Sequence, residues 1–431
     1  MHRVLFRAAL LLLAPACLLA QVPSQRRVPP PVVQPLVAPP DPLHEAPQNV
    51  TISLLTMGTG PAVWQMFGHS AIWIHDNRFN TDTVFNWGVF NMREANFIPR
   101  FLKGLMLYQM GGETLDEVLY EYRYFNRDVV SQELDLTTAQ KDTILEIIRI
   151  NAQPENLKYR YDYFRDNCST RPRDILDRAL GGQIHAQSQR LVDRTYRSEA
   201  LRLMQLNKPL VTGVDIGLGV PADHQLTQWE NMFLPKELHD FIGNLQVKDS
   251  TGASHPLVRS RVVLFQSTRG PEPASPPNMV AWLWPLGAVI ALVMVALVAA
   301  ARSSRAAERA AAIVACIWCI VAGLLGLVLT ALWAVTDHVF AHSNENLLVF
   351  NPFWLVLAVL IVIYLSSGRS ARWTRGFALG LAALALLELI AHIVGIARQN
   401  NLAVVGLVLF PALALAWAST RATLSVRAGK V

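Results

Sequence analysis

The chain has 431 residues, of which 52% are hydrophobic and 16% charged, and its formal net charge is +6. This composition is too apolar for an ordinary soluble enzyme, and the apolar residues gather toward the C-terminal end. The positive charge does not indicate nucleic acid, because much of the excess lies in short loops between apolar segments, where basic residues set membrane orientation. The length suits two or three domains, and we expect no nucleic-acid partner.

Residues 1–21 have the pattern of a secretory signal peptide. In MHRVLFRAALLLLAPACLLAQ, basic residues precede an apolar run and then small residues, and we expect cleavage near Ala20. An uncleaved anchor is the alternative, and Cys17 in APAC lies in a poor lipidation signal. Residues 22–48 are rich in proline, which predicts an extended tether without a core.

Residues 49–268 have the patterns of a globular α+β domain with room for a core. Branched, alternating segments predict strands, and helical spacing of apolar residues predicts helices, the longest of them capped by Thr137. The predicted strands are 50–58, 69–76, 83–91, 106–112 and 128–136, and the predicted helices are 94–104, 137–152 and 168–180.

A short Pro/Gly/Ser-rich linker, 269–279, is followed by an apolar part, 280–420. Most of its apolar runs are long enough to cross about 30 Å of hydrocarbon as helices. We therefore expect an all-α transmembrane domain of five helices, and then a tail, 421–431. The runs are 280–301, 311–335, 352–366, 376–397 and 402–419.

Basic residues predict the orientation of these spans. Arginines or lysines follow the first, third and fifth spans, whereas the other two loops contain only Arg398 as a basic residue apart from histidines. The positive-inside rule makes the basic segments cytoplasmic. The domain of 49–268 is then outside, in agreement with the signal peptide. We expect a multi-pass protein of the bacterial inner membrane with a periplasmic N-terminal domain and a cytoplasmic C-terminus.

The cysteines single out one position. Cys17 leaves with the signal peptide, and Cys316 and Cys319 lie inside the second span, where small interface residues are the expected interpretation. Cys168 therefore has no disulfide partner in the exported domain. It lies among polar residues at an expected helix start, where the dipole and N–H groups would stabilise a thiolate. A buried structural thiol is the alternative.

A thiolate nucleophile needs a base, and His69 is the best candidate. In FGHSAIWI, Gly68 lets the chain turn and His69 opens an apolar strand. Asn86, on the next predicted strand, could orient the imidazole, although an ordinary cross-strand hydrogen bond is an equal alternative. The other histidines of the domain are weaker candidates for the base, and they are His75, His185, His224 and His239.

These motifs resemble a known family. FGHSAIWI, FNWGVFN and YDYFRDNCSTRPRDIL, followed by GVDIGLGVPAD and MFLPKEL, look like the Lnb N-terminal periplasmic domain, and TDHVFAHSNENLLVFNP looks like its five-span partner. The resemblance implies a permuted papain-like (NlpC/P60-type) fold and lipoprotein N-acyltransferase activity. It also implies that Cys168 takes an acyl chain from a phospholipid or lipoprotein ester, that His69 moves protons, and that a lipoprotein amine receives the chain.

Other polar residues are candidates for substrate binding. Arg171 lies near Cys168, and an outer membrane loop contains Asp337, His338, Asn344 and Asn346. A metal is not expected there, because the spacing matches no common zinc signature, and no cofactor is expected. A plain solvated loop is the alternative. The tyrosines that alternate ahead of Cys168, at 159, 161 and 163, form one face of a strand or a wall of an acyl pocket.

Three functions therefore remain open from the sequence. The first is the membrane-bound acyltransferase, with phospholipid and lipoprotein substrates. The second is a permuted papain-like amidase or peptidase acting on cell-wall peptides, and the third is a non-catalytic envelope protein that binds lipoproteins. The Cys–His pair disfavours the third. The five expected spans favour the first over the second, since a cell-wall enzyme would need one anchor.

Overall fold

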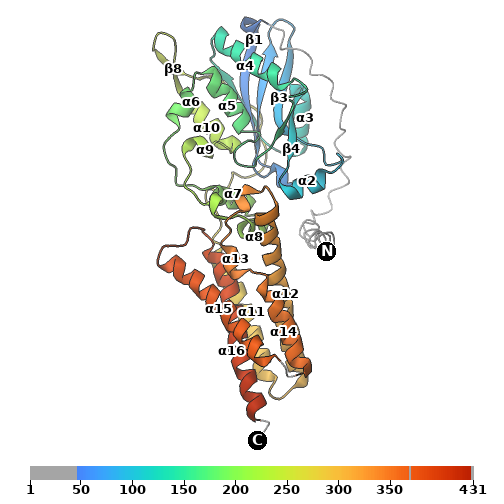
Figure 1. Ribbon diagram of the computed structural model, residues 1–431. Coiled ribbons are helices and arrows are strands. Elements are labelled where there is room, and N and C mark those ends of the chain that lie inside the picture. The colour runs from blue at the N-terminus through green and yellow to red at the C-terminus, as the bar shows by residue number, and fades with distance from the viewer. Residues whose placement is uncertain (1–45, 368–369, 429–431) are drawn as a thin grey trace. The chain divides into compact units, whose positions relative to one another are not determined.

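The computed structural model describes residues 46–367 and 370–428 (Figure 1). The expected signal peptide, 1–21, and most of the expected tether, 22–48, lie outside the described residues. The described chain divides into two compact units. The sheet unit comprises 46–199 and 225–274, and the helical unit comprises 200–224 and 275–428.

The sheet unit is built around an antiparallel sheet. Among the described residues it has seven strands in the order β6-β4-β3-β2-β1-β5-β9, and β7 and β8 form a separate pair. The first five predicted strands are present with ends that differ by a few residues. The bounds are β1 Val50–Met57, β2 His69–Asp76, β3 Thr81–Val89, β4 Leu107–Glu113, β5 Val129–Leu134, β6 Lys158–Arg160, β7 Gln246–Lys248, β8 Ser254–Pro256 and β9 Val258–Phe265.

Helices surround this sheet. The three predicted helices are present as α2, α4 and α5, and α4 begins where expected because the Thr137 side chain accepts the Gln140 N–H. Helix α7 crosses the boundary between the units. The bounds are η2 Pro47–Asn49, η3 Val63–Gln65, α2 Phe97–Lys103, α3 Leu115–Tyr124, α4 Thr138–Asn151, α5 Thr170–Ala179, α6 Gln183–Gln187, α7 Tyr196–Met204, α9 Gln228–Asn231 and α10 Pro235–Asn244.

Both faces of the sheet are buried, as alternation along β1 shows. Ile52 and Leu54 belong to a core shared with α4, α5 and α10. Leu55 and Met57 belong to a smaller core shared with α3. Successive side chains of a strand point to opposite faces, so β1, β2, β3 and β5 contribute to both cores.

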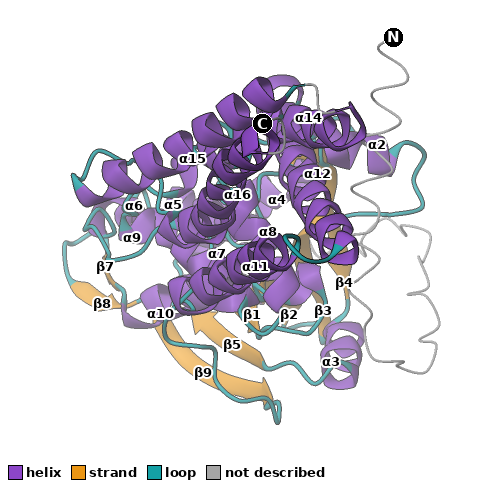
Figure 2. Cartoon of the chain, turned by 90° about the horizontal axis from the view of Figure 1, so that it is seen from below, coloured by secondary structure: helices purple, strands orange, loops and turns teal. Residues whose placement is uncertain are grey.

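The helical unit contains the predicted spans, which Figure 2 views from one end. Within the described residues, five helices are long and apolar enough to cross a membrane. The third span becomes long enough because α13 precedes α14, giving Asn346–Ser367. The bounds are α8 Lys208–Gly217, η4 Val220–Ala222, α11 Val280–Ala300, α12 Arg305–Val335, η5 Val339–Ala341, α13 Asn346–Val349, α14 Phe353–Ser367, α15 Ala371–Ile393 and α16 Leu402–Ala428.

Small residues bring the spans close together. A Cβ on Gly406 of α16 would lie 2.0 Å from Nε1 of Trp284 on α11, whose indole N–H donates to the Leu402 carbonyl at 3.0 Å. Cys319 of α12 is fully buried, and Cys316 lies 3.9 Å from the Ala358 carbonyl of α14. Both cysteines thus occupy helix contacts. Helix α16 continues to Ala428, through most of the expected tail.

Candidate active site

His69 and Asn86 lie side by side on neighbouring strands. His69 opens β2 opposite Met57, after a turn at Gly68, whose φ is +78°. Asn86 of β3 is buried, and its Oδ1 lies 2.9 Å from Nε2 of His69. The amide nitrogen of Asn86 donates to the Val84 carbonyl at 3.3 Å, so the oxygen faces the ring. Because that oxygen can only accept, Nε2 carries the proton and Nδ1 is left as the basic atom.

Cys168 lies in the turn that starts α5, and Asn167 shapes this turn. The Asn167 Oδ1 accepts the N–H groups of Ser169 at 2.8 Å and Thr170 at 2.9 Å. Its amide nitrogen donates to two backbone carbonyls at 2.9 and 3.0 Å. These bonds satisfy the first donors of the helix. The sequence prediction of free N–H groups at this helix start is therefore wrong for Ser169 and Thr170.

The sulfur of Cys168 faces the beginning of β2. The backbone N–H groups of Ser70 and of Cys168 itself are near enough to the sulfur to lower the pKa of the thiol. Ser70 follows His69 directly, so the thiol and the imidazole come from adjacent places although 99 positions separate them in the chain. Among the described residues, no hydrogen bond joins the Cys168 sulfur to the His69 ring.

Burial makes both groups neutral at rest. It raises the pKa of the Cys168 thiol from its ordinary 9.0 to about 11, against the lowering effect of the two N–H groups and Arg127. It lowers the pKa of His69 from 6.5 to about 4, against the raising effect of the Asn86 bond. Desolvation thus opposes the thiolate that the sequence predicts, and it outweighs the backbone donors and Arg127. The predicted catalytic role of the pair stays a prediction.

Arg127 is a buried cation that sequence reasoning missed. Its side chain is 3% exposed, its Nε donates to the Gly58 carbonyl at 2.8 Å, and its guanidinium lies 4.4 Å over the Tyr122 ring. Its charge lowers the pKa of both His69 and Cys168. A fixed cation beside a thiol is suited to stabilising negative charge there.

Sheet pairing explains why Arg127 reaches the site. Met57, the last residue of β1, pairs with His69 on one side and with Val129 on the other. Arg127 precedes Val129, the first residue of β5, by two residues. It therefore lies at the same end of the strands as His69, the first residue of β2. No local pattern in YFNRDVV indicates that Arg127 lies near His69, because this placement results from the strand order β2-β1-β5.

Gly88 is the second residue that the sequence did not reveal. The pairing of β3 with β4 shifts between Trp87 and Val89, which leaves Gly88 in a β-bulge with φ +90°. A Cβ there would lie 3.2 Å from Cε2 of Tyr161 and 3.7 Å from Cβ of Cys168. The bulge therefore lets the Tyr161 ring and Cys168 lie close to the backbone of β3.

The side chain of Arg171 is fixed by Asp166 and Tyr159. It forms a two-pronged ion pair with Asp166, one contact being 2.6 Å, and its guanidinium lies 3.8 Å over the Tyr159 ring. It thus braces the turn that carries Cys168. The predicted role of Arg171 in substrate binding stays a prediction.

The other predicted binding residues belong to the helical unit. Asn344 and Asn346 are buried, and both donate to the Ile216 carbonyl at 2.9 Å, at the end of α8. Asp337 is exposed and His338 half-buried, and both lie between α12 and η5. Their predicted roles in substrate binding also stay predictions. The two amide nitrogens are engaged by the chain itself.

A polar network continues from these asparagines into the spans. The Asn401 amide donates to Asn346 at 3.0 Å and to the buried Glu388 carboxylate of α15 at 3.2 Å. Gln399 donates to the Leu218 carbonyl at 3.0 Å. These bonds satisfy the C-terminal carbonyls of α8 and explain why 200–224 belong to the helical unit. The boundary expected at 268 does not follow this grouping.

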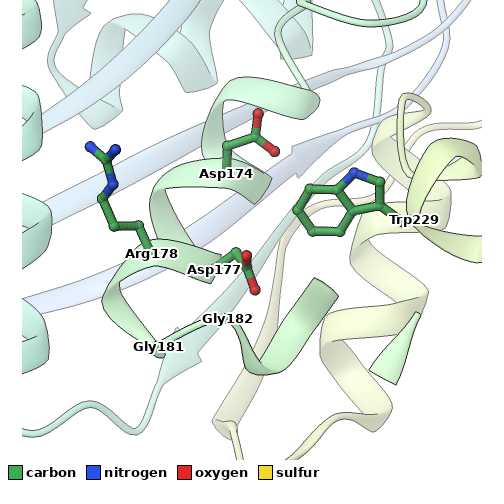
Figure 3. Close-up of a pocket in the computed structure, with 6 residues that line it drawn as sticks. All are labelled: Asp174, Asp177, Arg178, Gly181, Gly182 and Trp229. Atoms are coloured by element: carbon green, nitrogen blue, oxygen red, sulfur yellow. The ribbon is translucent and has the colours of Figure 1, made fainter. Parts of the chain in front are cut away.

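An open pocket of about 430 Å³ lies along the C-terminal half of α5 (Figure 3). The figure shows Asp174 and Trp229 on opposite sides of it. Asp174 is bonded to Arg173, and Asp177 accepts the His185 N–H, so its carboxylates are engaged. None of the predicted catalytic residues lines this pocket. Cys168 instead lies at the other end of α5, just before its first residue.

Comparison with known families agrees with this division. The family model of the Lnb N-terminal periplasmic domain matches residues 45–202, which include His69, Asn86 and Cys168. The model of the Lnb transmembrane domain matches residues 277–420. No curated protein and no solved structure matches the chain. The two models in this order cover most of the sheet unit and the five apolar helices, and the chain therefore belongs to the Lnb-type family of membrane proteins with an N-terminal periplasmic domain.

Proposed function

We propose that this protein is a cysteine-dependent acyltransferase. It would move an acyl chain from a phospholipid or lipoprotein ester to the N-terminal amine of a bacterial lipoprotein, through a thioester on Cys168. The observation that carries this proposal is the sulfur of Cys168 at the Ser70 N–H, one residue from a histidine whose ring is held by Asn86. Membership of the Lnb-type family supports a lipoprotein as the acceptor.

We also infer a permuted papain-like fold for the sheet unit. In such enzymes a helix N-terminus carries the cysteine and a strand carries the histidine. Here the strand β2 with His69 precedes the helix α5 with Cys168 along the chain. The arrangement of a nucleophile, a base and an orienting amide is recognised by geometry and not by chain order.

The first step would form the thioester. As the sulfur attacks the ester carbonyl carbon, the thiol proton passes to Nδ1 of His69, and the C–S bond forms. The tetrahedral intermediate then collapses with cleavage of the C–O bond, and His69 returns the proton to the leaving alcohol. A lysolipid leaves, and the acyl chain stays on Cys168.

Negative charge develops on the carbonyl oxygen during this step. The N–H groups of Ser70 and Cys168, which face the sulfur at rest, and the cation of Arg127 are the donors available at this place. Such fixed donors need no reorganisation when charge appears. They offset the unfavourable pKa values of the neutral pair, which is why a buried thiol can serve as nucleophile.

The second step would transfer the chain to nitrogen. A neutral α-amine attacks the thioester carbonyl, a C–N bond forms, and the C–S bond breaks. His69 accepts the proton that the amine loses and passes it to the departing sulfur, so that both groups return to their neutral state. The products are an N-acylated lipoprotein and the free enzyme.

The decisive measurement is mass spectrometry of lipoprotein N-terminal peptides from cells with and without the protein. We expect N-acylation to depend on the protein, to be lost in Cys168→Ser, and to fall by about 10²–10⁴-fold in rate in His69→Ala. Matched controls are Cys316→Ser, in a span, and His75→Ala, on the same strand as His69; both should retain activity.

Two results would contradict the proposal. Full complementation by Cys168→Ser, at normal protein abundance, would remove the catalytic role of the thiol. Unchanged lipoprotein peptides together with altered cell-wall muropeptides would show a cell-wall amidase instead.

A further inference from the structure

A continuous row of aromatic rings crosses one side of the sheet unit. Phe101 and Phe97 of α2 stack with centroids 6.2 Å apart, and Phe97 stacks on Phe90 at 5.8 Å. Phe90 stacks on Tyr108 of β4 at 4.9 Å, and Tyr108 lies 4.5 Å from Tyr161. All these separations are within the range of aromatic contact. The row therefore runs without a break from α2 to Tyr161.

The inner end of the row lies at the candidate nucleophile. Tyr161 and Cys168 approach the same point above Gly88, at 3.2 and 3.7 Å. Burial raises the pKa of Tyr108 to about 12 and also raises that of Tyr161. Tyr108 is 8% exposed and Tyr161 is half-buried, so this part of the row is largely shielded from water. A hydrocarbon placed here would lie beside the sulfur in apolar surroundings.

The outer end of the row is an exposed apolar patch. Met92, Ile98 and Phe101, which we call the α2 patch, are 50%, 55% and 38% exposed. Ile98 and Phe101 lie three residues apart and thus share one face of α2. Exposed apolar clusters commonly mark contact with a partner or a lipid. The patch is continuous with the row, because Phe101 belongs to both.

Positive charge borders the α2 patch. Glu94, the acid of this segment, is neutralised by Arg100 at 2.7 Å and Lys158 at 3.1 Å. Arg93 and Lys103 are exposed and have no ion-pair partner among the described residues. Apolar and aromatic residues flanked by cations are typical of segments that lie at a membrane surface, where the cations meet lipid phosphates.

We propose that the row is the binding site for one acyl chain of a membrane phospholipid. The chain enters at the α2 patch, lies along Phe97, Phe90 and Tyr108, and brings its ester carbonyl to Cys168. The inference rests on the proposed acyl transfer and names where its donor binds. A lipid is the occupant because five apolar helices keep the protein in a membrane and because Arg93 and Lys103 can hold a phosphate at the entrance.

Photo-crosslinking of the full-length protein in phospholipid vesicles tests the location. The photoreactive residue p-benzoylphenylalanine replaces Phe101 in one variant and Phe79 in the control. Phe79 is also an exposed phenylalanine, at 67%, but it lies in the turn after β2, at the opposite end of that strand from His69. We expect phospholipid adducts at position 101 well above those at 79. Equal yields, or a crosslink from 101 to residues 22–45 of the same chain, would overturn the proposal.

Donor selectivity tests the role. Acylation of Cys168 is followed by intact mass with phospholipid in vesicles and with phenyl acetate, a soluble ester that needs no chain site. We expect the double variant Ile98→Glu/Phe101→Glu to lower the rate with phospholipid by about tenfold or more, since two apolar contacts become charged, and to leave the rate with phenyl acetate unchanged. Phe79→Glu should change neither.

The outcomes separate this inference from the proposed function. If neither donor acylates Cys168 in the unaltered protein, the acyl transfer itself fails. If both donors acylate it and the double variant loses neither rate, or loses both equally, only the chain site is wrong. Loss of the phospholipid reaction alone supports the row as the acyl-chain site.

Discussion

At the scale of single residues, the site pairs two groups that burial keeps uncharged. Burial raises the pKa of Cys168 to about 11 and lowers that of His69 to about 4, which favours the neutral form of both groups near neutral pH. In the proposed mechanism the imidazolium and the oxyanion would form only during attack and would persist until the tetrahedral intermediate collapses. Arg127 is the cation that lowers the pKa of both groups.

Replacing Arg127 by methionine should shift both limbs of the pH profile upward. A cation disfavours the imidazolium and favours the thiolate, so its removal raises the pKa of His69 and the pKa of Cys168. Single-turnover acylation of Cys168 between about pH 4 and 11 gives both limbs. We also expect the rate to fall by about 10²-fold, since one charge-stabilising donor is lost.

The control for this prediction is Arg123→Met, which removes an exposed cation of α3. It should leave both limbs in place. An Arg127→Met protein that folds normally and keeps the original pH limbs would show that the guanidinium acts only through its bond to Gly58 and its contact with Tyr122.

At the scale of secondary-structure elements, the site depends on irregularities that periodic patterns do not reveal. The alternation of HSAIWIHD predicts β2 and the place of His69, and FNWG predicts the strand of Asn86. The bulge at Gly88 is a shift of register between two strands that are separate in the chain. The edge strand β9, VRSRVVLF, escaped prediction because two of its first four residues are basic and most of its side chains are exposed.

Gly88→Ala tests the bulge. The added Cβ would meet the Tyr161 ring at 3.2 Å, and φ +90° is strained for any side chain. We expect acylation of Cys168 to fall with phospholipid and with phenyl acetate alike, because the strained backbone and the displaced Tyr161 ring lie beside Cys168. Gly111→Ala, on the neighbouring strand where no positive φ is required, is the matched control and should retain most activity. Equal rates in the two variants would contradict a role for the bulge.

At the scale of the whole molecule, hydropathy predicts the membrane spans, and the distribution of basic residues predicts their orientation. The five spans follow from length and composition, and their ends differ by a few residues from the predicted runs. What the sequence could not provide is the grouping of 200–224 with the spans. That grouping depends on amide side chains such as Asn344 and Gln399 meeting the carbonyls of α8, and these partners are more than 120 positions apart. The strand order β2-β1-β5 likewise places Arg127 and His69 at the same end of the sheet.

The orientation of the spans is testable as a prediction of the positive-inside rule. Single cysteines placed in the loop after the first span, at Ser303, and in the loop after the second, at Ser343, are treated with a membrane-impermeant maleimide on intact spheroplasts, in a background lacking the other cysteines. We expect labelling at 343 and not at 303, because basic residues surround only the first of these loops. Labelling at 303 alone would contradict this prediction and show the opposite membrane topology.

The contact between the first and last spans bears on biosynthesis. Trp284 of α11 donates to Leu402, and its indole occupies the space left by Gly406. The acceptor for this indole therefore leaves the ribosome more than a hundred residues after its donor. A chain that stops before residue 402 leaves the Trp284 N–H without this acceptor and without the α16 backbone at Gly406 against which its indole packs. This contact can therefore form only after translation has entered the final span, and a truncated chain lacks the junction between the first and last spans.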